Sequence, residues 1–560
     1  MFSILNPEPR VFEMKPMVQI QTVIQLSCLI TGKTTSSLSP EESLISDSQK
    51  PPDFLEITPP SSSEGMQQSI QSASMLTIAM AITIPLGLIT KVLIPRYLGS
   101  EQAGHFFFAT TFPTAALALM PLGLGAYIKK TVPPRPEHVK EILRPICFLQ
   151  AGVGALLLAG VIAFMLLTNY SNDVILLTTV MGGFQAFTTF QNEILHTVFF
   201  ALGFSGDVAK LNVIGKIITS LLIGICLIAG GKVYALALFF LLGQVITTSW
   251  YMLRARSRGL LSGSMSTANF KQMFNVSLPF FIGALISSNN NYFVDTALLS
   301  RMATFKELGY YGAASGMGGV FMIIAPLIGN ALVPNLSRAY HHDRAEYKKM
   351  VEISLRLILV IAMPLSLGIM MFAPEIIGLL YGPDFKAAET SLMVQGALLT
   401  YLYFAVFTSS VAVISTRGRR LALITGSSFL FNALFDFLII PKFSGWLGEG
   451  GAAAGSSTAS LVSEILTCIF LMRLSQVMPL FSRMSYTFLI TALPPFLIFP
   501  LKFYYPDLGL VCRCLIYIIF LPSFALGTRI VTREELKIVY GQLVHQLRRL
   551  GRKAKLGQKL

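Results

Sequence analysis

The sequence has 560 residues, of which 53% are hydrophobic and 13% are charged, and its formal net charge is +15. A soluble domain carries about 25% charged residues, so this chain is too poor in polar surface to be a water-soluble globular protein and must be surrounded largely by lipid. The positive charge does not require a nucleic-acid partner, because basic loops beside anionic lipid headgroups account for it.

Residues 1–66 form a polar N-terminal segment. They contain eight prolines, eight of the 28 acidic residues and the run "SSLSPEESLISDSQKPPDFLEITPPSSSEG". A segment of this composition cannot bury enough apolar surface to offset the entropy lost on folding. We therefore expect residues 1–66 to be a disordered tail.

Apolar runs of about 20 residues, the length of a helix that crosses a bilayer, recur from residue 70 to residue 530. Helices are predicted, because lipid offers no hydrogen-bond partner to the backbone. The fourteen predicted spans are 72–95, 103–128, 143–168, 174–201, 209–230, 233–253, 273–299, 309–334, 352–381, 388–415, 421–440, 451–473, 485–505 and 508–530.

Lysine and arginine gather in the loops after the second, sixth, eighth and tenth spans, whereas the alternate loops contain at most two each. By the positive-inside rule the basic loops and both termini are cytoplasmic. The basic loops contain Lys129, Lys130, Arg135, Lys140, Arg144, Arg254, Arg256, Arg258, Lys271, Arg338, Arg344, Lys348, Lys349, Arg417, Arg419 and Arg420.

An internal repeat relates two parts of this helical region. The segment "RYLGSEQAGHFFFATTFPTAALALMPLGLGA" from Arg96 aligns without gaps with "RMATFKELGYYGAASGMGGVFMIIAPLIGNA" from Arg301, at an offset of 205 residues. Gly104 aligns with Gly309 in this match. The repeat predicts that the first and seventh helices begin equivalent bundles of six, as in transporters that bind substrate between parallel repeats.

The predicted fold is therefore an all-α, multi-pass membrane protein with two pseudo-symmetric six-helix lobes around a central cavity. The lobes comprise residues 70–254 and 270–474, and residues 485–530 supply two further helices. In residues 533–560, apolar residues at helical spacing accompany several arginines and lysines. This pattern predicts a basic amphipathic helix on the cytoplasmic leaflet.

Five segments resemble the polysaccharide-type flippases of the multidrug/oligosaccharidyl-lipid/polysaccharide exporter superfamily. They are "RYLGSEQAGHFFF", "VDTALLSRMATFKELGYYGAASGM", "LVPNLSRAYHHDRAEYKK", "APEIIGLLYGPDFKAAETSLMVQG" and "GGAAAGSSTASLVSEIL", and the resemblance extends from about residue 70 to about residue 480. The superfamily includes the lipid II flippases, which have fourteen helices. The long polar N-terminal tail departs from the family pattern.

The resemblance implies a flippase that carries a polyprenyl-diphosphate-linked oligosaccharide or glycan precursor across the cytoplasmic membrane by alternating access. It also implies an acidic residue near Asp295 and leaves a proton or a sodium ion open as the coupling ion. Two alternatives remain: an ion-coupled multidrug or organic-cation antiporter of the same superfamily, and a membrane glycan polymerase or ligase. A polymerase or ligase is less favoured, because the longest loops are on the cytoplasmic side.

The stretch "SSNNNYFVD" places polar residues within the seventh span. Ser288, Asn291 and Asp295 share one helical face. An aspartate within a span costs about 2.5–3.5 kcal/mol on insertion scales unless it faces water or a partner. We expect this face to line the cavity, and the alternative is hydrogen bonding between packed helices.

A second polar stripe, in "FQAFTTFQNEILHT", lies within the fourth span. Asn192 and His196 recur at helical spacing with Glu193 beside them, so Glu193 and His196 could pair or exchange a proton. The alternative is a polar seam inside the first lobe. Asp436 and Glu464 are predicted to be seam or interfacial residues.

Lys91 lies near the outer end of the first predicted span, and Lys216 and Arg356 lie deeper within their spans. They are candidates for contact with a diphosphate, to which cationic side chains donate charge-assisted hydrogen bonds. Snorkelling toward headgroups is the alternative for Lys91.

The sequence gives no sign of a catalytic or cofactor site. It lacks the phosphate-binding G-x-x-x-x-G-K-[ST] motif, and its histidines do not have the spacing of metal ligands. We expect no catalytic residue, no metal and no cofactor. The expected partners are a lipid-linked glycan and membrane lipids, not nucleic acid, and the expected oligomeric state is a monomer.

Overall fold

The computed structural model describes residues 62–262, 291–322, 336–415 and 418–477, together with a few single positions outside these ranges. They belong to one compact unit, Ile57–Leu560. Residues 1–61 of the predicted tail 1–66, the predicted tail 533–560, and nearly all of spans 485–505 and 508–530 lie outside the described residues. Residues 62–66, which were predicted to be disordered, are helical.

All regular secondary structure in the described residues is helical, with no strand among them. Within these ranges, nine helical segments are long and apolar enough to cross a membrane. Many of their large apolar side chains are exposed, which suits a lipid environment. The prediction of an all-α, multi-pass membrane protein is confirmed.

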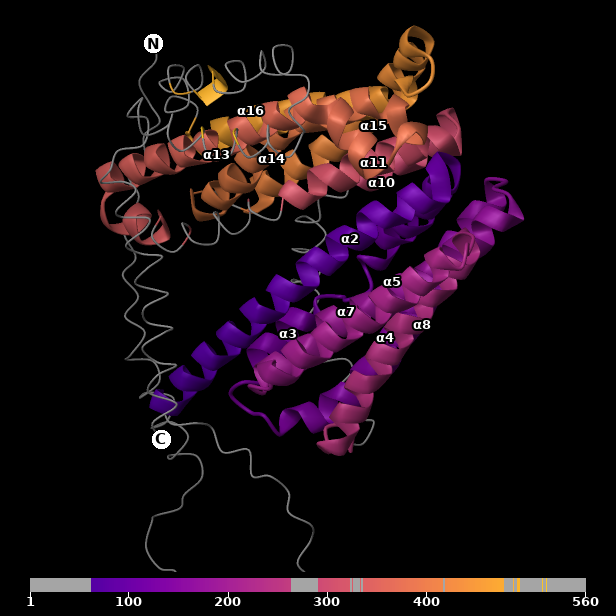
Figure 1. Ribbon diagram of the computed structural model, residues 1–560. Coiled ribbons are helices and arrows are strands. Elements are labelled where there is room, and N and C mark those ends of the chain that lie inside the picture. The colour runs from indigo at the N-terminus through magenta and orange to yellow at the C-terminus, as the bar shows by residue number, and fades with distance from the viewer. Residues whose placement is uncertain are drawn as a thin grey trace, which may run out of the picture. The chain divides into compact units, whose positions relative to one another are not determined.

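The first group of helices precedes residue 262 and is coloured indigo to magenta (Figure 1). Within it α2 packs against α5 and α7, and α8 packs against both of these helices. Its elements are α2 Ser62–Leu117, α3 Leu124–Thr131, α4 His138–Leu167, α5 Asn172–Phe190, the π-helical turn η1 Gln191–Leu195, α6 His196–Ala201, α7 Ser205–Ile228 and α8 Val233–Ser257.

The second group of helices follows residue 290 and is coloured rose to orange (Figure 1). Here α16 packs against both α14 and α15, and α13 packs against α14. Its elements are α10 Asn291–Met302, α11 Phe305–Phe321, α13 Arg344–Leu380, the 3-10 helix η2 Pro383–Ala388, α14 Glu389–Ser415, α15 Gly418–Leu447 and α16 Gly451–Leu474.

Two predicted spans differ in detail from the observed helices. The span predicted at 103–128 is interrupted after Leu117 by a turn in which Leu122 and Gly123 have positive φ angles of 49° and 74°. Pro121 in the same turn lacks the amide hydrogen that a continuing helix needs. The span predicted at 174–201 contains the π-helical turn η1, an insertion often found at functional sites.

The two groups meet where the second half of α2 packs against α11. A Cβ atom on Gly104 would lie 1.7 Å from the carbonyl oxygen of Phe305, and one on Gly309 would lie 1.9 Å from that of Ser100. The 205-residue offset of the repeat relates Gly104 to Gly309 and Ser100 to Phe305, so the contact is reciprocal. Only glycine permits this approach of two backbones.

A pair of arginine contacts repeats this reciprocity. Arg96 of the first group donates to the carbonyl oxygen of Leu379 at the end of α13, over 2.8 Å. Arg301 of the second group donates to the carbonyl oxygen of Thr168 at the end of α4, over 2.6 Å. Each guanidinium therefore binds the carbonyl end of a helix in the other group, where helical backbone is partially negative.

Candidate functional site

Two of the predicted basic residues lie close together on neighbouring helices. Lys91 is on α2 and Lys216 is on α7, and these helices pack against each other. The Lys216 ammonium lies 3.6 Å from where a Cβ on Gly87 would be, one helical turn before Lys91. The two positive charges repel each other. Their positions within predicted spans made both residues candidates but did not indicate their proximity.

Neither lysine has an acidic partner among the described residues. The ion pairs there are His138–Glu141, Asp207 with two arginines, Lys306–Glu449 and Glu352–Arg356. Two unpaired cations in an apolar helical region favour an anionic ligand, because a charge that loses water must be compensated. The arrangement can therefore hold a phosphate or a diphosphate.

Arg356 does not join this pair. It lies on α13 of the second group, where its guanidinium is 3.7 Å from the carboxylate of Glu352 one turn earlier. A local acidic partner therefore already compensates the charge of Arg356.

The fourth-span stripe is divided by the π-helical turn. Asn192 and Glu193 have exposed side chains, whereas His196 is buried. His196 hydrogen bonds with Gln191 over 3.4 Å and packs against the ring of Tyr251. Helical spacing of 3.6 residues per turn does not hold through a π turn, so the stripe does not form one continuous face.

Glu193 and His196 are not paired in this structure. The Glu193 carboxylate lies 3.2 Å from where a Cβ on Gly125 would be, beside α3. His196 instead lies next to a buried network in which Gln191 accepts from Gln244 and Thr248. The exposed Asn192 and Glu193 remain predicted cavity residues.

Asp295 is fully buried in the second group of helices, where it gathers side chains from three neighbours. It accepts hydrogen bonds from Tyr311 of α11, from Asn432 of α15 over 2.5 Å and from Ser460 of α16 over 2.8 Å. Asn432 also donates to Asp436 over 3.4 Å. In the conformation described, Asp295 thus faces a polar cluster between packed helices.

Asp436 brings a second carboxyl to this cluster and is also fully buried. The Asn432 amide donates to both carboxyl groups, and one Asp436 oxygen lacks a hydrogen-bond partner among the described residues. Two adjacent buried carboxylates cannot both keep an uncompensated negative charge. The cluster is therefore suited to holding a proton or a small cation.

Sequence reasoning missed Asn432 and treated Asp436 as a seam residue. Their spacing of four places them on one face of α15, which was a usable signal. What the spacing could not reveal is that Asp295, more than 130 residues earlier, lies opposite them. Glu464 of α16 is also buried, and neither of its carboxyl oxygens has a partner among the described residues.

The other seventh-span candidates are less informative. Ser288 lies outside the described residues. Asn291 is the first residue of α10, and the structure describes its backbone but not its side chain. No group of three or more histidine, cysteine, aspartate or glutamate side chains in the described part of the chain could hold a metal.

A curated relative is a flippase. The chain is 24% identical over 275 residues to the probable low-salt glycan biosynthesis flippase Agl15 of Haloferax volcanii. The match covers 48% of this chain and 55% of that protein, so the chain spans about half the length of this curated relative.

Two solved structures share the fold. The lipid II flippase MurJ, in an inward closed conformation, matches with a TM-score of 0.60 and 16% identity over 84% of this chain and 99% of that one. An inward-facing MATE family transporter of the MOP superfamily matches with a TM-score of 0.57 and 17% identity, over 73% of this chain and 99% of that one. At such identities the likeness establishes the fold and not the function.

The family is established by sequence. The model of the polysaccharide biosynthesis protein family matches residues 93–389, from α2 to the start of α14. This range contains Lys216, Asp295 and the reciprocal contact of Gly104 with Gly309. Because the match covers more than half of its 560 residues, the chain belongs to the polysaccharide biosynthesis protein family.

Proposed function

We propose that this protein is a flippase that moves a polyprenyl-diphosphate-linked oligosaccharide or glycan precursor across the cytoplasmic membrane by alternating access. Family membership and the flippase relative support this function. The observation that carries it is the neighbouring pair Lys91 and Lys216, which has no acidic partner among the described residues. The pair offers two cationic donors to a diphosphate.

In this proposal both termini are cytoplasmic, and the protein transports its substrate without chemical change. The loop charges support the orientation, because the basic ends of α3 and α8 would face the anionic cytoplasmic leaflet. The end where Gly104 meets Gly309 would then face outward. The described conformation would be closed on that side, with the substrate site reached from the cytoplasm.

We propose that Asp295 and Asp436 bind the coupling ion, either a proton or sodium. Their carboxyl groups, with Asn432 and Ser460, supply oxygen ligands of the kind that hard cations prefer. Binding there would neutralise the cluster and change the packing of α10 against α15 and α16, which contact one another. Ion binding would in this way bias the movement of the second group of helices.

A transport assay in proteoliposomes tests the proposal, with a fluorescent short-chain polyprenyl-diphosphate sugar as the probe. Probe molecules in the inner leaflet are protected from a quencher added outside, and flipping is measured as the loss of this protection. The double variant Lys91→Gln/Lys216→Gln should lower the rate about tenfold or more, since a hydrogen bond to a charged group contributes ~1.5–3 kcal/mol. Lys232→Gln, which removes one charge from an exposed site at the N-cap of α8, should leave the rate unchanged.

The second candidate is an ion-coupled antiporter of organic cations, favoured by the two buried carboxyls and by the fold shared with the MATE transporter. An antiporter should gain affinity for cations when Lys91 and Lys216 are neutralised, because two repelling charges are removed. Full flipping activity in the double variant, or proton-driven efflux of an organic cation by the wild type, would reject the flippase proposal.

A further inference from the structure

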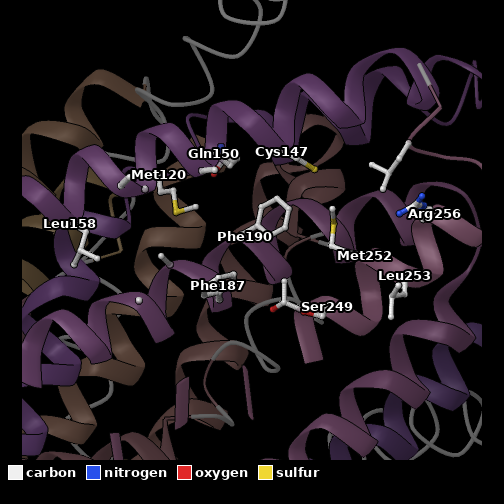
Figure 2. Close-up of a pocket in the computed structure, with 17 residues that line it drawn as sticks. Met120, Cys147, Gln150, Leu158, Phe187, Phe190, Ser249, Met252, Leu253 and Arg256 are labelled. Atoms are coloured by element: carbon white, nitrogen blue, oxygen red, sulfur yellow. The ribbon is translucent and has the colours of Figure 1, made fainter. Parts of the chain in front are cut away.

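A large apolar cavity lies away from the two lysines, among α4, α5 and α8. Its volume is about 750 Å³, within the roughly 300–1,000 Å³ of typical ligand pockets. Small residues open it, including Ala151 and Gly154 of α4 and Gly183 of α5, while Leu158 and Phe187 supply apolar wall. Figure 2 shows Leu158 toward one end and Arg256 toward the other, with Gln150 between them.

Gln150 is a polar exception within this cavity. Its side chain is fully buried, and neither its amide nitrogen nor its carbonyl oxygen has a hydrogen-bond partner among the described residues. An unsatisfied buried amide costs about 1–3 kcal/mol. A ligand that brings an ester, a carbonyl or a hydroxyl group to this depth would remove the penalty.

Arg256 is the cationic residue at the arginine-rich end of the cavity. Its neighbours Arg254 and Arg258 both bind Asp207, with N–O distances of 3.4 and 2.5 Å. Arg256 has no ion pair in the part of the chain that the structure describes. Its charge is therefore available to a ligand at the end of α8 that loop charges predict to be cytoplasmic.

Polarity decreases along α4 in the order expected for a membrane lipid. Gln150 is twelve residues after the start of α4 at His138, which is about 18 Å at 1.5 Å per residue. Leu158 lies about 12 Å beyond Gln150 on the same scale. A cation at the surface, an amide below it and apolar walls beyond match a charged headgroup, a glycerol ester and an acyl chain.

We propose that this cavity binds one anionic glycerophospholipid from the cytoplasmic leaflet. Its phosphate contacts Arg256, an ester or hydroxyl group binds the Gln150 amide, and one acyl chain lies against Leu158 and Phe187. Basic pockets between helices on the cytoplasmic side suit such headgroups. The site is separate from Lys91 and Lys216, so it does not depend on the proposed flippase activity.

The test uses phosphatidylcholine vesicles that contain a minor fraction of phosphatidylglycerol with a photoactivatable acyl chain. After irradiation, mass spectrometry of peptides locates the labelled residues. We expect labelling of α4 and α8 at cavity residues, about fivefold above that given by a phosphatidylcholine probe with the same chain, because one arginine near the surface contributes ~1 kcal/mol to anionic lipid binding.

Variants separate the headgroup from the chain contribution. Arg256→Gln should reduce phosphatidylglycerol labelling to the phosphatidylcholine level, whereas Arg254→Gln, a matched loss of charge outside the cavity lining, should not. Ala151→Phe should reduce labelling by both probes because it fills the cavity. Leu156→Phe, at a 72% exposed position on the same helix, should leave it unchanged.

Equal labelling of the wild type by both probes would overturn the proposal, and that comparison needs no variant. The proposal would also be overturned if the Arg256→Gln variant were labelled by phosphatidylglycerol as strongly as the wild type. Displacement of the probe by stoichiometric polyprenyl phosphate would overturn it as well and would assign the cavity to a substrate tail. Transport by the Arg256→Gln variant is measured in parallel, so failure here is distinguished from failure of the lysine site.

Discussion

At the scale of single residues, two buried acids of the second helix group, Asp295 and Asp436, share one polar cluster. Asp295 satisfies its oxygens with a tyrosine, an asparagine and a serine, all from other helices. Asp436 keeps one oxygen unpaired among the described residues. A carboxyl pair of this kind is stable only with a proton or a cation, because the surrounding helices exclude water.

Replacing Asp295 with asparagine should therefore uncouple transport from its ion. The amide keeps the shape and part of the hydrogen bonding but removes one negative charge, so the fold should survive. We expect the transport rate of Asp295→Asn to stop responding to imposed proton and sodium gradients in proteoliposomes. Glu346→Gln, at an exposed acid in the first turn of α13, should respond like the wild type. A gradient response that persists in Asp295→Asn would exclude this coupling site.

At the scale of elements, α16 begins without a capping side chain of its own. Its N-cap is Gly450, with φ at 83°, and the sequence before it is "GWLGEG". Glu307 of α11 supplies the missing acceptor, since its carboxylate receives the Gly450 and Ala453 amides over 2.5 and 3.0 Å. A negative charge at a helix N-terminus also interacts favourably with the helix dipole.

Glu307→Ala should consequently destabilise the protein by about 1–3 kcal/mol, because two buried backbone amides lose their acceptor. Thermal unfolding in detergent measures the change as a lower midpoint. Glu307→Gln, which keeps one acceptor oxygen, should lose less. Glu101→Ala, at an exposed acid on α2, serves as the control. An unchanged midpoint for Glu307→Ala would show that water replaces the carboxylate at this helix end.

The contact between α2 and α11 should decide whether that end of the protein closes. Gly309→Ala places a methyl group against the Ser100 carbonyl oxygen, and the backbones must separate. Tyr170 and Ser300, which hydrogen bond across the two groups over 2.9 Å, provide sites for a cysteine pair. We expect Gly309→Ala to reduce cross-linking of this pair by a short thiol reagent several-fold.

Gly316→Ala is the matched control on α11, because a Cβ there would have no neighbour within 4 Å. With the same cysteine pair introduced, Gly316→Ala should cross-link as efficiently as the protein that carries the cysteine pair alone. If Gly309→Ala cross-links equally well, the close backbone approach is not required for closure.

At the scale of the whole molecule, the reciprocal contacts imply that the two groups of helices contribute equally to closure. Arg96 and Arg301 are related by the 205-residue repeat, and each binds the carbonyl end of a helix in the opposite group. Arg301 also stacks on the ring of Tyr170, 3.6 Å from its centroid. Equivalent contacts related by a pseudo-symmetry axis should have similar energies.

Arg96→Gln and Arg301→Gln should therefore each favour the open state by a similar amount, and the double variant by about the sum of the two, since the sites share no partner. A cysteine at Ser100, a buried position between the helix groups, reports opening through its reactivity with a water-soluble thiol reagent. The measurement is made in a background without other cysteines. If the two single variants change the labelling rate by amounts that differ more than about tenfold, the closure is not pseudo-symmetric.

The sequence by itself determined the class of protein and most of its helices. The lengths of the apolar runs predicted the membrane-spanning helices, because a bilayer imposes one thickness on every helix that crosses it. The helices α4, α7, α8, α13, α14 and α16 include almost all of the spans predicted there. The 205-residue repeat also identified Gly104 and Gly309 as equivalent, since sequence similarity survives wherever a close backbone contact admits only one residue.

Local irregularities were beyond sequence periodicity. The π-helical turn at Gln191–Leu195 redirects His196 into the first helix group, although the residues around it keep helical spacing in the sequence. An insertion in the hydrogen-bond ladder changes the face on which every later residue lies, and it leaves no composition signal.

The tertiary structure alone decided which polar residues meet. Lys91 lies near Lys216, Asp295 lies near Asp436, and Arg356 pairs with Glu352. These partners are from 4 to more than 120 residues apart in the chain. A helix in lipid displays an apolar surface on nearly all sides, so periodicity does not identify its inward face, and only the packing of neighbouring helices determines which charges are compensated.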